Sequence, residues 1–274
     1  MILVHLTDLH IRPLGLAAYR TAETNMLTER ALRAVARLRQ TPDAVVITGD
    51  LTDNGLDSEY AMLADMLGRL IKVPVYVIPG NHDRREALKA QLKHLPGVND
   101  HPDFVQYTAM VAGHRLVMLD TVIPGSGAGT LCAERLAWLD ATLAADTSTP
   151  TIVAMHHPSF ACGIRHMDKI NLQNPQGFTA IIAKHPQVKR ILCGHHHRPI
   201  TAQVAHAIAS IGPSVAHQVE FTLGDDPGFW NLEPAAFHVI TDMPDDGLIT
   251  HTVYVEDYPG PFPFLPDPDY PGRP

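Results

Sequence analysis

Five short apolar segments of the chain each end in side chains that can bind a metal ion. The segments, each predicted to be a buried strand, span residues 2–7, 44–48, 73–78, 151–155 and 188–193. The polar residues that follow them are, in order, Asp8 and His10, Asp50, Asn81 and His82, His156, and His195 and His197. Because α/β sheets place their sites at the carboxyl ends of the strands, we expect these five groups to converge.

The remaining sequence predicts the elements that surround these strands. Helices are predicted over residues 21–40, about 57–70, 84–94 and around 136–143. Further strands are predicted at 104–112 and 115–120, which form an antiparallel pair, and at 201–211, 236–241 and 248–255. Residues 158–176 lack periodicity and are expected to form an irregular loop. From this loop, Phe160, Cys162, Arg165, His166 and Met167 are candidates to line a substrate pocket. The order of elements predicts an α/β sandwich with a pair of mixed sheets.

Histidine is the outlier of the composition, with 17 residues, and it is the commonest metal ligand. Carboxylate, amide and imidazole groups suit manganese, iron, zinc or cobalt, and ligand chemistry does not choose among these metals. In Asp-x-His and His-x-His, alternation along an extended segment is expected to place the outer side chains together. Leu9 and His196 would then point elsewhere. A single Asp can bridge two ions, because it has one oxygen for each.

The chain is acidic, with a formal net charge of -8, so it gains no overall attraction for a long nucleic acid. Its three cysteines lie far apart and do not indicate a disulfide framework. No segment approaches the ~18 apolar residues of a membrane-spanning helix, and the first residues do not have the pattern of a signal peptide. A cytoplasmic location without a membrane partner is the default expectation.

The order of the five polar groups resembles the signature of the calcineurin-like metallophosphoesterase superfamily. The matching blocks are Asp8-x-His10, Gly49-Asp50, Gly80-Asn81-His82-Asp83, His156 and Gly194-His195-x-His197. Within the superfamily the chain resembles the bacterial class III cyclic nucleotide phosphodiesterases and the related glycerophosphodiesterases. Chain length, the His156-His157-Pro158 block and segment 214–218 carry this narrower resemblance. The resemblance implies an αββα sandwich of two mixed sheets flanked by helices, with a small C-terminal cap or oligomerisation segment.

Three parts of the chain are expected on this basis. Residues 1–200 form the dinuclear metallophosphoesterase core, residues 201–257 add the remaining core strands and a cap, and residues 258–274 are a proline-rich tail. The tail holds seven of the 23 prolines, so it cannot be an interior strand or helix. Its large apolar residues indicate docking on its own domain or on a neighbour. Together with the oligomers common among similar enzymes, they predict a homo-oligomer, dimer or higher.

The resemblance also assigns roles to the polar residues, around two divalent metal ions per chain. One ion is assigned to Asp8, His10, Asp50 and His197. The other is assigned to Asp50, Asn81, His156 and His195, so that Asp50 bridges. Asp50 and Asn81 also belong to the catalytic set, with His82 as the histidine that contacts the phosphoryl group or assists the leaving group. Substrate contacts are expected from Asn81, His82, His217 and Arg12, and a structural ion pair is the alternative for Arg12.

The activity implied is hydrolysis of small phosphodiesters, with cyclic nucleotides and glycerophosphodiesters as the main candidates and broad specificity among the options. Two ions clamp a phosphoryl group and lower the pKa of a bound water from 15.7 toward about 7, so that hydroxide attacks phosphorus. Three alternatives stay open. A phosphomonoesterase would need cations such as Arg12 and Arg165, and a nuclease is opposed by the acidic charge. A metal-free scaffold should show gaps in the ligand set, and the sequence shows none.

Overall fold

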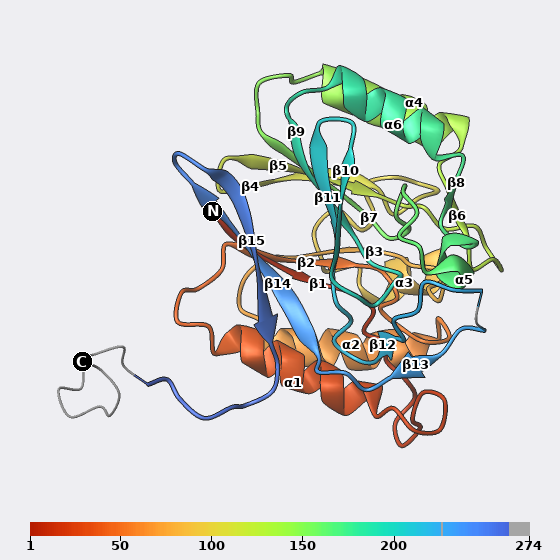
Figure 1. Cartoon of the computed structure of the whole chain (residues 1–274), viewed down its shortest axis with the longest axis vertical. Helices are drawn as coiled ribbons and strands as arrows, with labels where there is room; N and C mark the ends of the chain where they lie inside the picture. The colour runs from red at the N-terminus through yellow and green to blue at the C-terminus, as the bar shows by residue number, and fades with distance from the viewer. Residues whose placement is uncertain (226, 263–274) are drawn as a thin grey trace, which may run out of the picture.

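Two mixed β-sheets pack face to face in the computed structural model, which describes residues 1–225 and 227–262 (Figure 1). The first sheet consists, in spatial order, of β15 (Gly247–Tyr254), β14 (Ala236–Met243), β1 (Ile2–Leu6), β2 (Ala44–Thr48) and β3 (Val75–Ile78). The second consists of β10 (Ile200–Val204), β11 (Ala207–Ile211), β9 (Val188–Cys193), β7 (Thr151–Met155), β5 (His114–Leu119) and β4 (Tyr107–Val111). Strands β1, β2 and β3 are parallel to one another, as are β11, β9, β7 and β5, whereas β14, β15, β10 and β4 are antiparallel to their neighbours.

Helices lie outside both sheets. In Figure 1, α1 (Thr24–Ala36) and α2 (Asp57–Leu70) lie beside the first sheet, and α4 (Ala133–Ala144) and α6 (Pro175–Lys184) lie beside the second. The shorter elements are α3 (Arg85–Gln91), α5 (Arg165–Asp168) and two ribbons, β6 (Gly129–Thr130) with β8 (Leu172–Gln173), and β12 (Gln218–Val219) with β13 (Trp230–Asn231). The predicted αββα sandwich of two mixed sheets is therefore confirmed.

The second sheet is buried on both faces, with the first sheet on one side and helices on the other. Alternate residues of its strands point to opposite sides and so enter different cores. Along β5, Leu116 and Met118 join the core between the sheets, whereas Val117 and Leu119 join the core beneath α4 and α6. This explains why the central strands are continuously apolar in the sequence rather than alternating.

The prediction of an irregular loop over 158–176 was wrong in part. The segment contains α5, β8 and the first residues of α6. Pro175 occupies the first turn of α6, where its missing N–H costs nothing. Phe178, Ile181 and Ile182 then follow at helical spacing and are buried. The helical periodicity of α6 is present in the sequence, but only these three apolar residues carry it.

A tyrosine side chain ties the edges of the two sheets together. Val77 on the edge strand β3 donates its N–H to the Tyr107 hydroxyl at 2.9 Å, and that hydroxyl donates to the Val77 carbonyl at 2.9 Å. Tyr107 lies on β4, the edge strand of the other sheet. Both backbone groups of Val77 are thus satisfied without a further strand, as buried backbone groups must be.

Among the described residues, no helix is long and apolar enough to cross a membrane. The expected docking of the proline-rich tail concerns residues 263–274 for the most part, and these lie outside the described residues.

Tyr107→Phe should lower the free energy of unfolding by about 2–5 kcal/mol, because it leaves two buried backbone groups without a partner. Urea unfolding followed by circular dichroism measures the loss. Tyr76→Phe is the matched control, since its hydroxyl has no hydrogen bond among the described residues. Equal losses in the two variants would contradict the role given to Tyr107.

Candidate metal centre

The structure brings all seven predicted ligands to one place, the carboxyl edges of the two sheets. They follow β1, β2, β3, β7 and β9: Asp8 and His10, Asp50, Asn81, His156, and His195 and His197. Six of them are buried, and Asn81 is half-buried at the surface of a pocket. The convergence of strand ends expected from the sequence is therefore what the fold produces.

The backbone at this edge adopts a conformation that most residues avoid. Five of the seven residues have positive φ: Asp8 at 56°, His10 at 47°, Asp50 at 46°, His195 at 74° and His197 at 52°. Each left-handed non-glycine residue costs on the order of 1–3 kcal/mol and persists only where the surroundings hold it. The sequence argument assumed that Asp-x-His lies in an extended segment. This assumption was wrong, because Asp8 and His10 are left-handed and do not belong to a strand.

Four of the residues form the first cluster. The potential ligand atoms of Asp8, His10, Asp50 and His197 all lie within 4.8 Å of one another. His197 Nε2 is 3.4 Å from Asp8 Oδ1, and His10 Nε2 is 3.2 Å from His197 Nε2. Two imidazoles and two carboxylates at this spacing suit a divalent cation of the first transition series or zinc.

A second cluster lies on the other side of Asp50. His156 Nε2 is 3.0 Å from Asn81 Oδ1 and 3.5 Å from Asp50 Oδ2. The same Asp50 oxygen is 3.6 Å from His10 Nε2 in the first cluster. His156 also groups with His157 and His195, which are all buried. Asp50 is thus the carboxylate shared by both clusters.

Each histidine has one ring nitrogen next to an oxygen acceptor that can hold the orientation of the ring. His10 Nδ1 lies 3.1 Å from Asp53 Oδ1, and His156 Nδ1 lies 2.7 Å from the Thr48 carbonyl. In the same way His197 Nδ1 is 2.8 Å from the His217 carbonyl, and His195 Nε2 is 3.1 Å from the Ile170 carbonyl. Such acceptors fix the tautomer of metal-binding histidines. The donor set therefore fits two divalent cations.

Burial and the mutual attraction between Asp50 and the histidines set the protonation states of these side chains. Burial acts to raise the pKa of Asp50, but the neighbouring His156, His82 and His10 hold it well below its usual value. Burial acts to lower the pKa of His156, and Asp50 outweighs it and raises this pKa to about 9. Burial and neighbouring histidines keep the pKa of His195 well below its usual value, so this ring is neutral, as a ligand must be.

Glycines let the two halves of the site approach closely. A Cβ at Gly80 would lie 2.2 Å from Asp50 Oδ1 and 2.7 Å from His156 Cε1. A Cβ at Gly49 would lie 2.5 Å from His156 Nδ1, and Gly49 also has positive φ. No larger residue fits either position without moving a predicted ligand.

Two carboxylates around the site were not identified as ligand-orienting residues from the sequence. Asp53 accepts from His10 and from Arg12 Nη1 at 2.5 Å. Asp83 is buried and accepts hydrogen bonds from donors that follow both β2 and β3: the N–H groups of Leu51, Thr52 and Gly80 and the hydroxyls of Thr52 and Tyr60. The neighbouring His82 ring donates from Nδ1 to the Asp53 carbonyl at 2.9 Å. The Asp-Leu-Thr-Asp spacing of Asp50 and Asp53 was the only available signal.

A pocket of about 280 Å³ opens beside the two clusters. Its floor contains His10, Asp50, Asn81, His195 and His197, and His82 lies at its edge with its side chain 34% exposed. From the 158–176 segment, the pocket is lined by His166, Met167 and Ile170. Phe160, Cys162 and Arg165 do not line it. None of the described lining residues is Lys or Arg.

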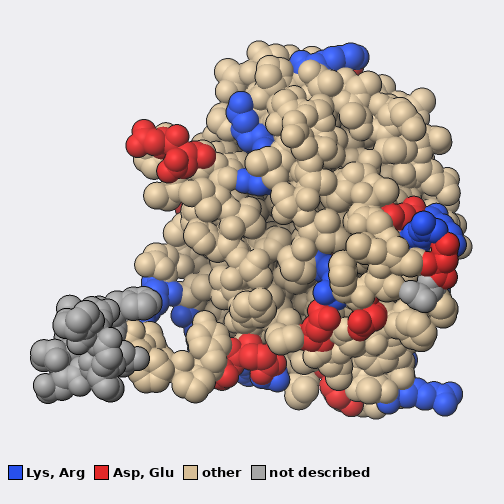
Figure 2. Space-filling view, in the orientation of Figure 1, with Lys and Arg blue, Asp and Glu red and all other residues tan. Residues whose placement is uncertain are grey.

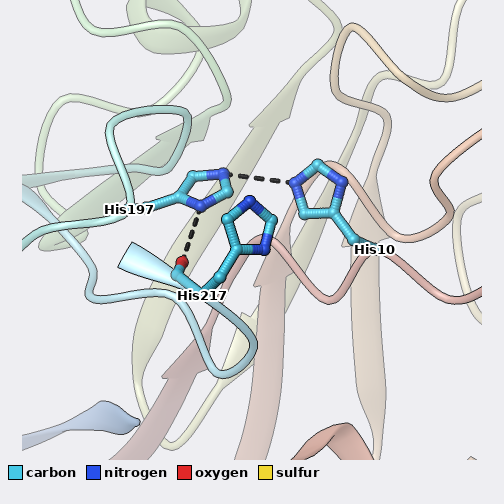
Figure 3. Close-up of side chains that lie close together, drawn as sticks. All are labelled: His10, His197 and His217. Carbon is cyan, nitrogen blue, oxygen red and sulfur yellow. Dashed lines mark hydrogen bonds between the residues drawn. The ribbon is translucent and has the colours of Figure 1, made fainter. Parts of the chain in front are cut away.

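The two further substrate candidates lie in different surroundings. His217 lines the pocket, and its ring is 4.6 Å from that of His197 and 5.1 Å from that of His10 (Figure 3). Burial, reinforced by these neighbours, strongly lowers the pKa of His217, so its ring is neutral. Arg12 forms an ion pair with Asp53 and does not line the pocket.

This fold and this donor set are those of a metallophosphoesterase, and residues 1–199 match the family model described as calcineurin-like phosphoesterase. The chain belongs to that family. It is 34% identical over 268 residues to a protein of Arcobacter nitrofigilis named a probable glycerophosphodiester phosphodiesterase GpdQ, a match that covers 96% of this chain and 97% of that protein. It is 35% identical to a protein of Rhodopseudomonas palustris named a probable cyclic nucleotide phosphodiesterase, covering 93% of each. A dimetal phosphatase from Danio rerio has the same fold, with a TM-score of 0.64, 16% identity and coverage of 93% of this chain and 99% of that one.

Asp53→Ala should weaken binding of one metal ion by about 10- to 100-fold, because His10 loses the acceptor that holds its ring. Calorimetric titration of Mn²⁺ into the metal-free protein measures this, and the other site should keep its affinity. Asp57→Ala is the control, as an exposed carboxylate at the start of α2. The orienting role fails if the two variants bind both ions equally well.

Proposed function

We propose that the chain is a dinuclear metal phosphodiesterase that hydrolyses small phosphodiesters. The observation that carries the proposal is the position of the Asp50 carboxylate between two clusters of buried histidines. The relatives named for cyclic nucleotides and for glycerophosphodiesters support both substrate classes as candidates.

In this proposal Asp8, His10, Asp50 and His197 hold one ion, and Asp50, Asn81, His156 and His195 hold the other. When bound, two divalent ions supply positive charge that polarises the phosphoryl oxygens and makes a water molecule more acidic. The donor set is compatible with manganese, iron, zinc or cobalt.

The side chains at the edge of the pocket act on the substrate directly. His82 donates from Nδ1 to the Asp53 carbonyl, which leaves Nε2 as the ring nitrogen that can carry a proton toward the leaving oxygen. Its backbone N–H is held by Asp50 Oδ1 at 2.9 Å. Asn81 presents Oδ1 to the His156 side, so its amide N–H₂ is available to a phosphoryl oxygen. His217, neutral and buried, is a weaker candidate for a substrate contact.

The charge of the pocket favours a diester over a monoester. A phosphomonoester is a dianion near neutral pH and calls for cationic side chains, and none of the described lining residues is Lys or Arg. A nuclease is also disfavoured. Figure 2 shows basic side chains scattered over the visible face without a continuous stripe, and the net charge is -8.

Metal-loaded protein should hydrolyse the diester bis(p-nitrophenyl) phosphate faster than the monoester p-nitrophenyl phosphate. Both rates are measured on one preparation. Removing the metals with a chelator should abolish both activities, and Mn²⁺ should restore them. The proposal is wrong if the Mn²⁺-loaded protein cleaves neither this diester nor cyclic nucleotides nor glycerophosphodiesters. A protein that binds no added metal would instead be a scaffold.

Asp50→Ala and His82→Ala should fail in different ways. Asp50→Ala should lose metal and activity together, because both clusters share this carboxylate. His82→Ala should keep its metals and lose kcat by about 10²- to 10⁴-fold, the range of general acid assistance. Metal content by mass spectrometry and kcat on one diester separate the two. His94→Ala, at an exposed position on the chain, is the control, and metal loss in His82→Ala would refute the role of that residue.

We also propose that the chain forms a homo-oligomer through its second half and its proline-rich tail. Leu223, Leu232, Tyr258 and Phe262 in this part of the chain expose large apolar side chains, which is common at interfaces. Light scattering that gives the mass of one chain at working concentration would reject this. The cytoplasmic location stays a prediction.

A further inference from the structure

One wall of the pocket consists of aromatic side chains, and the proposed reaction does not explain why they are grouped there. Tyr19, His217, Phe229 and Trp230 form it. The rings of Tyr19 and Trp230 are stacked, with centroids 5.1 Å apart and an interplanar angle of 26°. His217 stands edge-on to both, at 5.3 Å from Tyr19 and 5.6 Å from Trp230. Because His217 also contacts His197, the wall runs continuously outward from the metal centre.

The backbone around Tyr19 is arranged to present its ring. Tyr19 and Arg20 both have positive φ, at 50° and 61°, which is unfavourable for a bulky side chain. Hydrogen bonds between Ala18 and Ala22, at 2.8 and 2.9 Å, close this tight turn. Tyr19 is nevertheless 57% exposed, so the strain does not serve core packing. Strain of this kind is characteristic of ligand-binding positions.

The other half of the wall is fixed by a small ribbon. Strand β12 begins directly after His217, and its Val219 pairs with Trp230 on β13. The Glu220 N–H donates to the Phe229 carbonyl at 2.9 Å. A Cβ at Gly228 would lie 2.7 Å from His166 Cδ2, so the ribbon packs closely against α5. The pocket between them has one aromatic side and one side formed by Met167 and Ile170.

The chemistry of these walls fits a flat and uncharged group. The only carboxylate that lines the pocket, among the described residues, is Asp50 on the floor, and no Lys or Arg is present. Stacked aromatic side chains bind nucleobases through their faces and tolerate different bases. A glycerol or ethanolamine arm would leave this wall uncovered. The volume of about 280 Å³ is at the lower end of small-molecule sites and suits a single ring-bearing arm.

We propose that Tyr19 and Trp230 form a stacking subsite that selects diesters in which one ester arm carries a flat, uncharged ring, such as a nucleobase. The inference rests on the proposed phosphodiesterase function, because the phosphoryl group at the metal centre positions that arm. Trp230 is then a specificity-determining residue, and a cyclic nucleotide is a better substrate than a glycerophosphodiester with an acyclic arm.

The kinetic test compares cyclic AMP with glycerophosphoethanolamine. Trp230→Leu keeps an apolar side chain but removes the stacking face, so kcat/KM for cyclic AMP should fall by about 10- to 100-fold, chiefly through KM. Glycerophosphoethanolamine should change by less than about 3-fold, since it makes no ring contact. Trp230→Phe should restore most of the loss. Phe221→Leu is the matched control, because Phe221 is a surface aromatic residue that lies under Arg198 outside this pocket.

A binding test decides the inference even if no diester is cleaved. The chain has two tryptophans, and Trp138→Phe leaves Trp230 as the single reporter. In the metal-loaded variant, AMP should quench the Trp230 fluorescence, whereas glycerol phosphate, which shares the phosphate group, should not. Equal responses to the two ligands, or equal losses of both diesterase activities in Trp230→Leu, would overturn the subsite. Absence of all diester hydrolysis alongside selective quenching would overturn the proposed function and leave the subsite standing.

Discussion

The close approach of two sheets at their carboxyl edges is the constraint on which the rest of the structure depends. Asp50 and Asn81 come from the first sheet, and His156 comes from the second, yet their polar atoms lie within 3.0 to 3.5 Å. The backbone at Gly80 has no room for a Cβ. The site is therefore a seam between two layers rather than a hollow in one. The hydrogen bonds of the buried Asp83 help to hold the loops after β2 and β3, where left-handed backbone conformations carry a local cost.

The two sheets and the helices that flank them could be predicted from the sequence, but some of the shorter elements could not. The buried strands are continuous apolar runs that end in glycine or polar residues, and helical periodicity separates the early ones, so the sandwich of mixed sheets could be predicted. The segment 158–176 could not, because a four-residue helix and a two-residue strand are held by tertiary contacts and leave almost no pattern. The division of the chain into a core, a cap and a tail remains a prediction.

The ligand set was predictable because each member directly follows a strand, and its chemistry is visible in the residue types. The residues that support and surround it were less so. Asp53 acts on His10 through a hydrogen bond between separate loops. An aspartate in a loop between a strand and a helix more often caps the helix, so its position alone does not indicate this role. Tyr19 and Trp230 lie at opposite ends of the sequence, and only the folded chain stacks them. Pairings of this kind leave no local spacing to detect.

The hydroxyl of Tyr107 has a consequence for how molecules of this protein can associate. A sheet grows when the free backbone groups of its outermost strand accept another strand. At Val77 those groups are already occupied by a side chain from the opposite layer. Another strand therefore cannot pair with Val77 on β3, beside the metal seam, whereas the opposite border of this sheet is β15. Tyr107 therefore acts against strand pairing between molecules at the border of the sheet that is nearest the reacting groups.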